Sequence, residues 1–240
     1  MHKITYASIS KTGKRPRNED SFKIIDTPDA NRWVGIIADG MGGHTKGDIA
    51  SKVVVDAISR YWEKNSQLTD SEEKVKKARI KASVAIDEAA IQNGFAQMGT
   101  TMVMASIEND KVTIAHIGDS RCYLIRPGHY DYDDINNTEK DHVVYQTQDH
   151  VRKDCGWEVI SRSFFSFKPE KAVPEIAQFD LQLGDRIFLC SDGVYKCIAP
   201  QVLKDHLLED KTPEQILETI DSLCEQSSDD NYTAIMVRID

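Results

Sequence analysis

Short runs in which apolar and polar residues alternate recur along the chain and predict β-strands. Successive side chains of a strand point to opposite faces, so this alternation is typical of a sheet with one covered face. Asn109 and Asp110 separate two such runs and predict a hairpin turn. The predicted strands are Ile4–Ser10, Ser21–Asp26, Trp33–Asp39, Thr100–Ile107, Val112–Ile117, Cys122–Arg126, Val143–Thr147, Arg186–Ser191 and Tyr232–Ile239.

Apolar residues with helical spacing lie between some of these strands. From Ile49 to Trp62 they form one continuous stripe, which predicts an amphipathic helix. Thr69-Asp70-Ser71-Glu72 predicts a capping box that opens a second, long helix, and Asn93-Gly94 predicts its end. Thr212-Pro213-Glu214-Gln215 predicts the start of a late helix with proline in its first turn.

The order of these elements predicts an α+β fold. Strands come first, then two helices, then more strands, and finally a helix and a last strand. Strict βαβ alternation is missing, so we expect two packed antiparallel β-sheets flanked by helices rather than a parallel sheet. The chain has no internal repeat and no linker rich in Pro, Gly or Ser, which predicts a single domain over residues 1–240.

Composition narrows the class of protein. Hydrophobic residues make up 40% and charged residues 29% of the 240 residues, which is typical of a folded globular chain. The net charge of −9 argues against nucleic acid as a partner, because proteins that bind phosphate backbones usually present a basic face. No apolar stretch reaches the ~18–20 residues of a membrane helix, so no membrane partner is expected. The start of the chain has no apolar signal-peptide core.

Cysteine usage indicates a reducing compartment. The five cysteines are an odd number, lie far apart and include no Cys-x-x-Cys pair. A disulfide framework or a structural zinc site is therefore not expected. We predict reduced thiols in a soluble cytoplasmic protein.

The candidate chemistry lies in small acidic islands at the ends of predicted strands. A glycine or a small polar residue accompanies each aspartate, so backbone can approach closely there. An Asp-Gly pair at the end of a strand is more often an ordinary turn than a metal site. An arginine such as Arg15, taken alone, is more often a surface charge than a binding residue. Together, converging carboxylates would repel one another unless a cation lay among them, and hard oxygen ligands favour Mg²⁺ or Mn²⁺. The islands are Asn18-Glu19-Asp20, Asp39-Gly40-Met41-Gly42-Gly43-His44, Gly118-Asp119-Ser120-Arg121, Ser191-Asp192-Gly193 and Asp229-Asp230-Asn231.

The order of these islands gives the chain a specific resemblance. It resembles the metal-dependent serine/threonine protein phosphatases of the type 2C (PPM) family, in particular the bacterial branch. The resemblance implies two antiparallel β-sheets packed face to face, helices outside them, and metal ions in a cleft at one edge. The matching segments are Arg15-Pro16-Arg17-Asn18-Glu19-Asp20, Ala38-Asp39-Gly40-Met41-Gly42-Gly43-His44, Met98-Gly99-Thr100-Thr101, His116-Ile117-Gly118-Asp119-Ser120-Arg121, Cys190-Ser191-Asp192-Gly193 and Asp230-Asn231-Tyr232-Thr233.

The resemblance also implies a set of metal ligands. Asp39 would bridge two ions, and Gly40 would offer its backbone carbonyl to one of them. Asp192 and Asp230 would complete the shell of the other ion. Asp119 matches the family's ligand for a third, weaker metal site.

Other residues of the same motifs would support this centre. Asp20 and Glu19 would hold metal-bound waters or orient the ligands. Arg15 would clamp the phosphate oxygens, because its planar guanidinium suits a bidentate grip. Asn231 would orient Asp230, although a simple turn residue is an equally good interpretation.

The reaction implied is hydrolysis of phosphoserine and phosphothreonine in proteins by a metal-activated water. The cofactors would be two Mn²⁺ or Mg²⁺ ions and a possible third, and the partners would be proteins phosphorylated by a Ser/Thr kinase. No Cys-x₅-Arg signature supports a covalent cysteinyl route. Two alternatives are a low-activity regulatory binding module with the same fold and a two-metal nuclease, the latter disfavoured by the acidic charge.

Two segments depart from the family pattern. Met41 stands where eukaryotic members often have a histidine assigned as general acid, and His44 is an alternative candidate for that role. Asp149 and Arg162 are only 162 − 149 = 13 positions apart, so the helical flap that usually lies between such motifs must be trimmed or absent. Next to it, Phe164, Phe165 and Phe167 could form an exposed docking surface or simply pack in the core.

Overall fold

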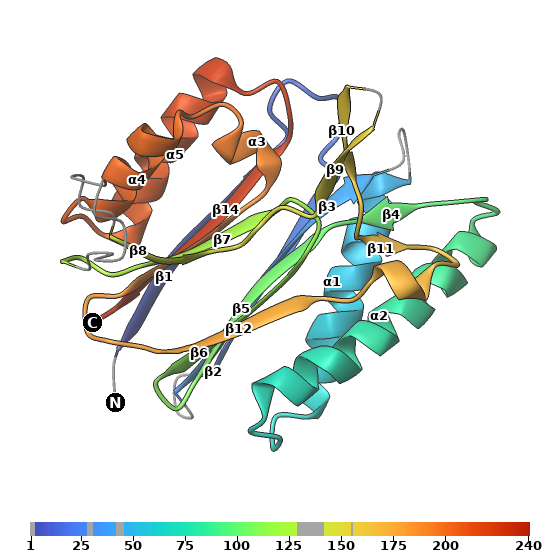
Figure 1. Cartoon of the computed structure of the whole chain (residues 1–240), viewed down its shortest axis with the longest axis horizontal. Helices are drawn as coiled ribbons and strands as arrows, with labels where there is room; N and C mark the ends of the chain where they lie inside the picture. The colour runs from blue at the N-terminus through green and yellow to red at the C-terminus, as the bar shows by residue number, and fades with distance from the viewer. Residues whose placement is uncertain (1–2, 28–30, 42–45, 129–141, 155) are drawn as a thin grey trace.

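The computed structural model describes residues 3–27, 31–41, 46–128, 142–154 and 156–240 (Figure 1). Within these ranges the chain forms two β-sheets that pack face to face, with helices on both outer sides. Figure 1 shows α1 and α2 on one side of the sheets, and α3, α4 and α5 on the other. The predicted α+β class with two packed antiparallel sheets is confirmed.

The first sheet joins the two ends of the chain. Its strands lie in the order β1-β14-β13-β7-β8, and neighbouring strands run antiparallel. Their bounds are β1 Ile4–Lys11, β14 Tyr232–Ile239, β13 Arg186–Cys190, β7 Arg121–Ile125 and β8 Val143–Gln146.

The second sheet has the order β11-β4-β3-β5-β6-β12, with β2 also paired to β3. Each of these pairings is antiparallel. Asn109 and Asp110 form the predicted turn between β5 and β6, both with positive φ. The bounds are β2 Asp20–Thr27, β3 Arg32–Met41, β4 Gly99–Thr100, β5 Met102–Glu108, β6 Lys111–Ile117, β11 Phe164–Phe165 and β12 Glu175–Asp180.

The helices cover the outer faces and begin close to the predicted positions. α1 (Gly47–Lys64) and α2 (Ser71–Gln92) cover the second sheet, and α2 ends at Asn93 and Gly94 as predicted. The predicted capping box on Thr69 is wrong, because Asp70 is the N-cap and accepts a hydrogen bond from the N–H of Glu73. The first sheet carries α3 (Asp192–Tyr195), α4 (Pro200–Leu208) and α5 (Pro213–Ser227), the last with a capping box on Thr212.

The central strands alternate less clearly between apolar and polar residues than the strands of a sheet with one covered face, because the core lies on both of their faces. On β3, Trp33 and Ile37 point between the sheets, whereas Val34, Ile36 and Ala38 pack against α1 and α2. Both faces of β3 are therefore covered, and its side chains are buried on each side. No helix of the described residues is long and apolar enough to cross a membrane.

A short β-hairpin stands where the family's flap would begin. It consists of β9 (Val151–Asp154) and β10 (Trp157–Ile160), which form a separate two-stranded sheet. The sequence pattern did not predict this hairpin, nor β12, α3 and α4. Phe164 is fully buried in β11, so the alternative of an exposed docking surface is wrong for it, whereas Phe167 is 49% exposed.

Candidate active site

A cleft of about 590 Å³ opens among the acidic islands and gathers most of the predicted site residues. We call it the acidic cleft. Asp20 does not line it and lies buried beside Asp39, its partner across β2 and β3. The predicted residues that line the cleft are Arg15, Glu19, Asp39, Gly40, Asp119, Asp192, Asp230 and Asn231.

Asp20 and Asp39 are brought together by strand register. Residues directly opposite in an antiparallel pair have Cβ atoms ~4.5–5.5 Å apart on the same face of the sheet. One oxygen of Asp20, Oδ2, accepts a 2.7 Å hydrogen bond from Ser191, but Oδ1 is buried with no partner among the described residues. Burial raises the pKa of Asp20 to about 7, although hydrogen bonds from Ser191 and Thr233 oppose this shift.

The backbone of Asp39 is fixed by two threonines just before β5. Its N–H donates to Thr101 Oγ1 at 2.9 Å, and its carbonyl accepts from Thr101 N–H at 2.9 Å and from Thr100 Oγ1 at 2.8 Å. Burial raises the pKa of the Asp39 carboxyl well above its usual value, and the charges of Asp20, Asp192 and Asp119 add to the shift. The Asp39 carboxylate, which the resemblance assigns as the bridging ligand, therefore lies in surroundings that disfavour its ionised form.

Two glycines allow the islands to approach one another. A Cβ on Gly40 would collide with the backbone of Gly47 and of Glu19, and a Cβ on Gly193 would collide with the Asn231 carbonyl. The close approach of Gly193 to the Asn231 carbonyl holds the Asp192 island against the Asp230 island. Glycine beside each aspartate is thus required for close packing, whatever role the Gly40 carbonyl has.

Asp119 and Asp192 face each other from the two sheets. Asp119 follows β6 at a bend where Gly118 has φ +106°, and Asp192 is the first residue of α3. Burial and the nearby Asp192 charge raise the pKa of Asp119. Lys196, which the sequence analysis missed, reaches both carboxylates, with Nζ 2.5 Å from Asp192 Oδ2 and 3.5 Å from Asp119 Oδ2.

Arg15 lies at the mouth of the cleft and is held by the last island. Its Nη2 donates to Asp230 Oδ2 at 2.9 Å and its Nε to the Asp229 carbonyl at 3.2 Å. Its side chain remains 56% exposed, so the guanidinium is accessible to a ligand in the cleft.

Asn231 connects this arginine-bearing loop to the strands. Its Nδ2 donates to the carbonyls of Thr12 and Arg17, and its Oδ1 accepts from the N–H of Glu19 at 2.8 Å. Its backbone N–H also donates to Asp230 Oδ1 at 2.8 Å. The residue is 6% exposed and ties the segment between β1 and β2 to the start of β14, which goes beyond an ordinary turn.

The donor set of the acidic cleft fits divalent cations. Asp39, Asp119 and Asp20 have pKa values raised by burial and by the charges of neighbouring carboxylates, of which Asp192 acts on all three, and Asp20 Oδ1 has no partner among the described residues. Such charge is compensated when hard cations bind among the carboxylates. Asp39, Asp192 and Asp230 would hold these cations, and Asp20 and Glu19 lie close enough to orient them.

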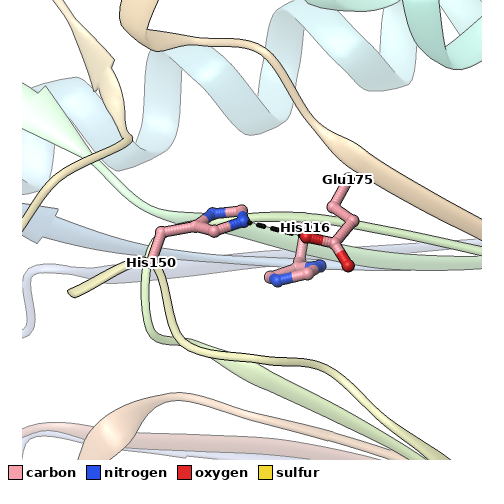
Figure 2. A group of neighbouring side chains, drawn as sticks. All are labelled: His116, His150 and Glu175. Carbon is pink, nitrogen blue, oxygen red and sulfur yellow. Dashed lines mark hydrogen bonds and ion pairs between the residues drawn. The ribbon is translucent and has the colours of Figure 1, made fainter.

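A second group of metal-type ligands lies outside the cleft and was not predicted. His116, His150 and Glu175, which we call the imidazole cluster, have potential ligand atoms within 4.8 Å of one another (Figure 2). The two rings stack with centroids 4.5 Å apart and an interplanar angle of 11°. A metal ion lies in the plane of each imidazole that binds it, and two stacked planes share no such position.

Hydrogen bonds or close polar neighbours occupy the ring nitrogens of this cluster except His116 Nδ1, which is buried with no partner among the described residues. His116 Nε2 donates to the Gln148 carbonyl at 2.8 Å, and His150 Nδ1 accepts from the N–H of Gly118 at 3.2 Å. His150 Nε2 faces Glu175 at 3.4 Å, the dashed line in Figure 2, and Arg162 Nη1 lies 3.3 Å from the same nitrogen. Burial lowers the pKa of both histidines and so favours their neutral forms, in which His150 supports the Gly118 bend and His116 holds the Gln148 carbonyl.

The remaining predictions concern the rim of the cleft. Met41 and Ile160 line it, so the β9–β10 hairpin contributes a wall in place of a helical flap. His44 lies outside the described residues.

Comparisons with known proteins agree with this geometry. The family model for protein phosphatase 2C matches residues 10–238. The serine/threonine phosphatase stp of Listeria monocytogenes serotype 4b (strain F2365) is 29% identical over 249 residues, covering 94% of this chain and 92% of the relative.

Solved structures show the same fold. PppA, a key regulatory component of T6SS in Pseudomonas aeruginosa, superposes with a TM-score of 0.77 at 27% identity, covering 99% of this chain and 98% of that one. The catalytic domain of the serine/threonine protein phosphatase PstP, in complex with two manganese ions, gives a TM-score of 0.80 at 23% identity, covering 100% of this chain and 99% of that one. At that identity the second likeness shows the fold alone.

Proposed function

Because the chain belongs to the protein phosphatase 2C family, we propose that it hydrolyses phosphoserine and phosphothreonine in proteins with divalent metal ions held in the acidic cleft. The observation that carries this proposal is the convergence of Asp20, Asp39, Asp119, Asp192 and Asp230 from both sheets. The stp relative is itself named a serine/threonine phosphatase, which supports the substrate class.

Asp39, Asp192 and Asp230 would hold two ions, either Mn²⁺ or Mg²⁺. The PstP catalytic domain binds two manganese ions in the same fold, which supports this number. Bound divalent ions activate water and neutralise the charge of a phosphoryl group.

The protein's own side chains supply binding and orientation. Arg15, which lines the cleft and stays accessible, would bind phosphate oxygens with its guanidinium. Thr100 and Thr101 fix the backbone of Asp39, and Asn231 fixes both the Arg15 loop and Asp230. Such preorganisation matters because a misplaced group weakens charge stabilisation in the transition state.

The wider setting follows from the same family membership. The partners would be proteins phosphorylated by a Ser/Thr kinase, and the catalytic unit would span residues 1–240 as one domain. The described cysteines Cys122, Cys190, Cys197 and Cys224 are free thiols, which supports a reducing compartment such as the cytoplasm.

The test is phosphate release from a phosphothreonine peptide and from para-nitrophenyl phosphate. Metal-stripped protein is titrated with Mn²⁺ and with Mg²⁺, and Asp192→Ala serves as the inactive variant. We expect release that depends on metal and disappears in Asp192→Ala. Folded wild-type protein that releases no phosphate with either metal would instead indicate a regulatory binding module.

A further inference from the structure

Lys196 is held next to Asp192 by a single helical turn. Asp192 begins α3, and the N–H of Lys196 donates to its carbonyl at 3.0 Å. Side chains four positions apart lie on the same face of a helix. The Lys196 ammonium can therefore reach the Asp192 carboxylate, and Nζ lies 2.5 Å from its Oδ2, while the lysine side chain remains 56% exposed.

The same ammonium also reaches the other sheet. Nζ lies 3.5 Å from Asp119 Oδ2, so one positive charge bridges the two carboxylates. The Asp119 side chain is 9% exposed and that of Asp192 17% exposed, so water screens these charges poorly. A cation between them is stabilising for this reason.

Neighbouring side chains limit where the lysine can go. Tyr195, the preceding residue, lies under the Arg121 guanidinium with 3.5 Å between the guanidinium carbon and the ring centroid. Arg121 in turn makes a bidentate pair with Asp149 at 2.9 and 2.8 Å. Lys196 thus directly follows a braced ring, whose centroid lies 6.0 Å from Nζ, and its amine reaches two carboxylates that line the acidic cleft.

This arrangement disagrees with the third metal site that the family resemblance implies at Asp119. A third ion at Asp119 would need the carboxylate that Lys196 already binds, and it would meet the positive charge of that ammonium. We propose that the Lys196 ammonium fills the cation position between Asp119 and Asp192, so that this enzyme uses two metal ions and a tethered lysine in place of a third ion. The inference rests on the proposed function for its catalytic meaning, but the count of bound ions does not depend on turnover.

The first test counts bound Mn²⁺ in the full chain by equilibrium dialysis and elemental analysis. Wild type is expected to saturate at two ions per chain, as in two-metal sites. Lys196→Asp places a carboxylate beside Asp119, so this variant should bind one further, weaker ion. Lys81→Asp, the same charge change on the exposed face of α2, should leave the count at the wild-type value.

The second test uses Lys196→Gln, which removes the charge without adding a ligand. Mn²⁺ affinity should rise about tenfold because a competing positive charge is gone, while turnover at saturating Mn²⁺ should fall about tenfold. Lys196→Arg should restore turnover because it keeps the charge. If Lys196 were only structural, Lys196→Gln would not raise Mn²⁺ affinity while lowering turnover, since partial unfolding weakens both metal binding and turnover.

Either of two results would overturn the inference: a third ion bound by wild type, or Lys196→Gln that loses Mn²⁺ affinity and turnover together. Failure of the proposed function would look different. In that case wild type would release no phosphate from the phosphothreonine peptide, yet Lys196→Asp would still gain an ion.

Discussion

The acidic cleft and the imidazole cluster both bring together atoms that metal ions bind, and they differ in how their charge is balanced. In the cleft, Asp20 and Asp39 have raised pKa values, and one oxygen of Asp20 is buried without a partner among the described residues. In the cluster, His116 and His150 are stacked, their lowered pKa values favour the neutral rings, His116 donates to the Gln148 carbonyl, and His150 accepts from the N–H of Gly118. His116 Nδ1 is also buried without a partner among the described residues, but a neutral ring nitrogen carries no charge that a cation must balance. Proximity of ligand types is therefore a weak criterion for a metal site, and uncompensated charge is a stronger one.

The largest expected effect is loss of turnover on removing a single charge from the cleft. Asp39→Asn should lower kcat by ~10³-fold or more, because a bridging carboxylate would be lost from the metal centre. The metal-free variant should be more stable than metal-free wild type, since one of several mutually repelling carboxylates is gone. Turnover is measured on the phosphothreonine peptide and stability by urea denaturation with EDTA.

Asp205→Asn is the matched control, because Asp205 is an exposed residue of α4 that does not line the cleft. Asp205→Asn should leave both turnover and the stability of the metal-free protein unchanged. Near-normal turnover in Asp39→Asn would remove the basis for placing the metal centre at this strand end.

Metal addition should stabilise the protein through the cleft alone. At a Mn²⁺ concentration 100 times its Kd, binding to the native state adds ~2.7 kcal/mol to the free energy of unfolding, which is measurable as a rise in Tm. Asp192→Ala should lose most of this rise, whereas His116→Gln should keep it. A rise that disappears in His116→Gln and persists in Asp192→Ala would reverse the assignment of the two regions.

A smaller effect is expected at the mouth of the cleft. Arg15→Ala should lower kcat/KM for the phosphothreonine peptide about 10- to 100-fold, the range for one or two charge-assisted hydrogen bonds. Arg15→Lys should recover only part of the loss, because lysine lacks the planar fork. Lys14→Ala, which removes an exposed ion pair with Asp229, is the control and should change kcat/KM little.

Much of the acidic cleft could be predicted because its residues lie at or beside the ends of strands that the sequence predicts well. Asp39, Asp119 and Asp192 come at or just after the end of an apolar run, Asp20 and Asp230 come just before one, and the motif order identifies the family. Lys196 could have been found from its spacing, since a lysine four positions after Asp192 in a helical turn must face that carboxylate. Its second contact with Asp119 could not, because that contact depends on how the two sheets pack.

The elements that were missed are those whose patterns are short or mixed. The strands of the β9–β10 hairpin and β12 have exposed polar residues and make few core contacts, so alternation is weak there. The imidazole cluster joins His116, His150 and Glu175 from three separate elements, and no local pattern signals that they meet. It forms because Gly118, in a left-handed conformation, turns the chain so that its N–H and carbonyl both bond His150.

The smallest expected effect belongs to this cluster and appears as a dependence of stability on pH. Burial lowers the pKa of His116 and His150 in the folded state below the unfolded value of about 6.5. Below that pH the unfolded chain binds more protons than the folded chain, so the free energy of unfolding falls as pH falls, by at most ~1.4 kcal/mol per pH unit for each histidine. The raised pKa values of Asp20 and Asp39 make the free energy of unfolding change with pH in the opposite direction. The measurement is therefore made with saturating Mn²⁺, which keeps these carboxylates ionised.

His116→Gln should be less stable than wild type at pH 7.5. The difference in the free energy of unfolding should narrow steadily toward pH 5.5, because the variant has one fewer histidine to protonate on unfolding. A gap that stays constant over this range would show that His116 is not held neutral, and the contrast with the charged cleft would lose its physical basis.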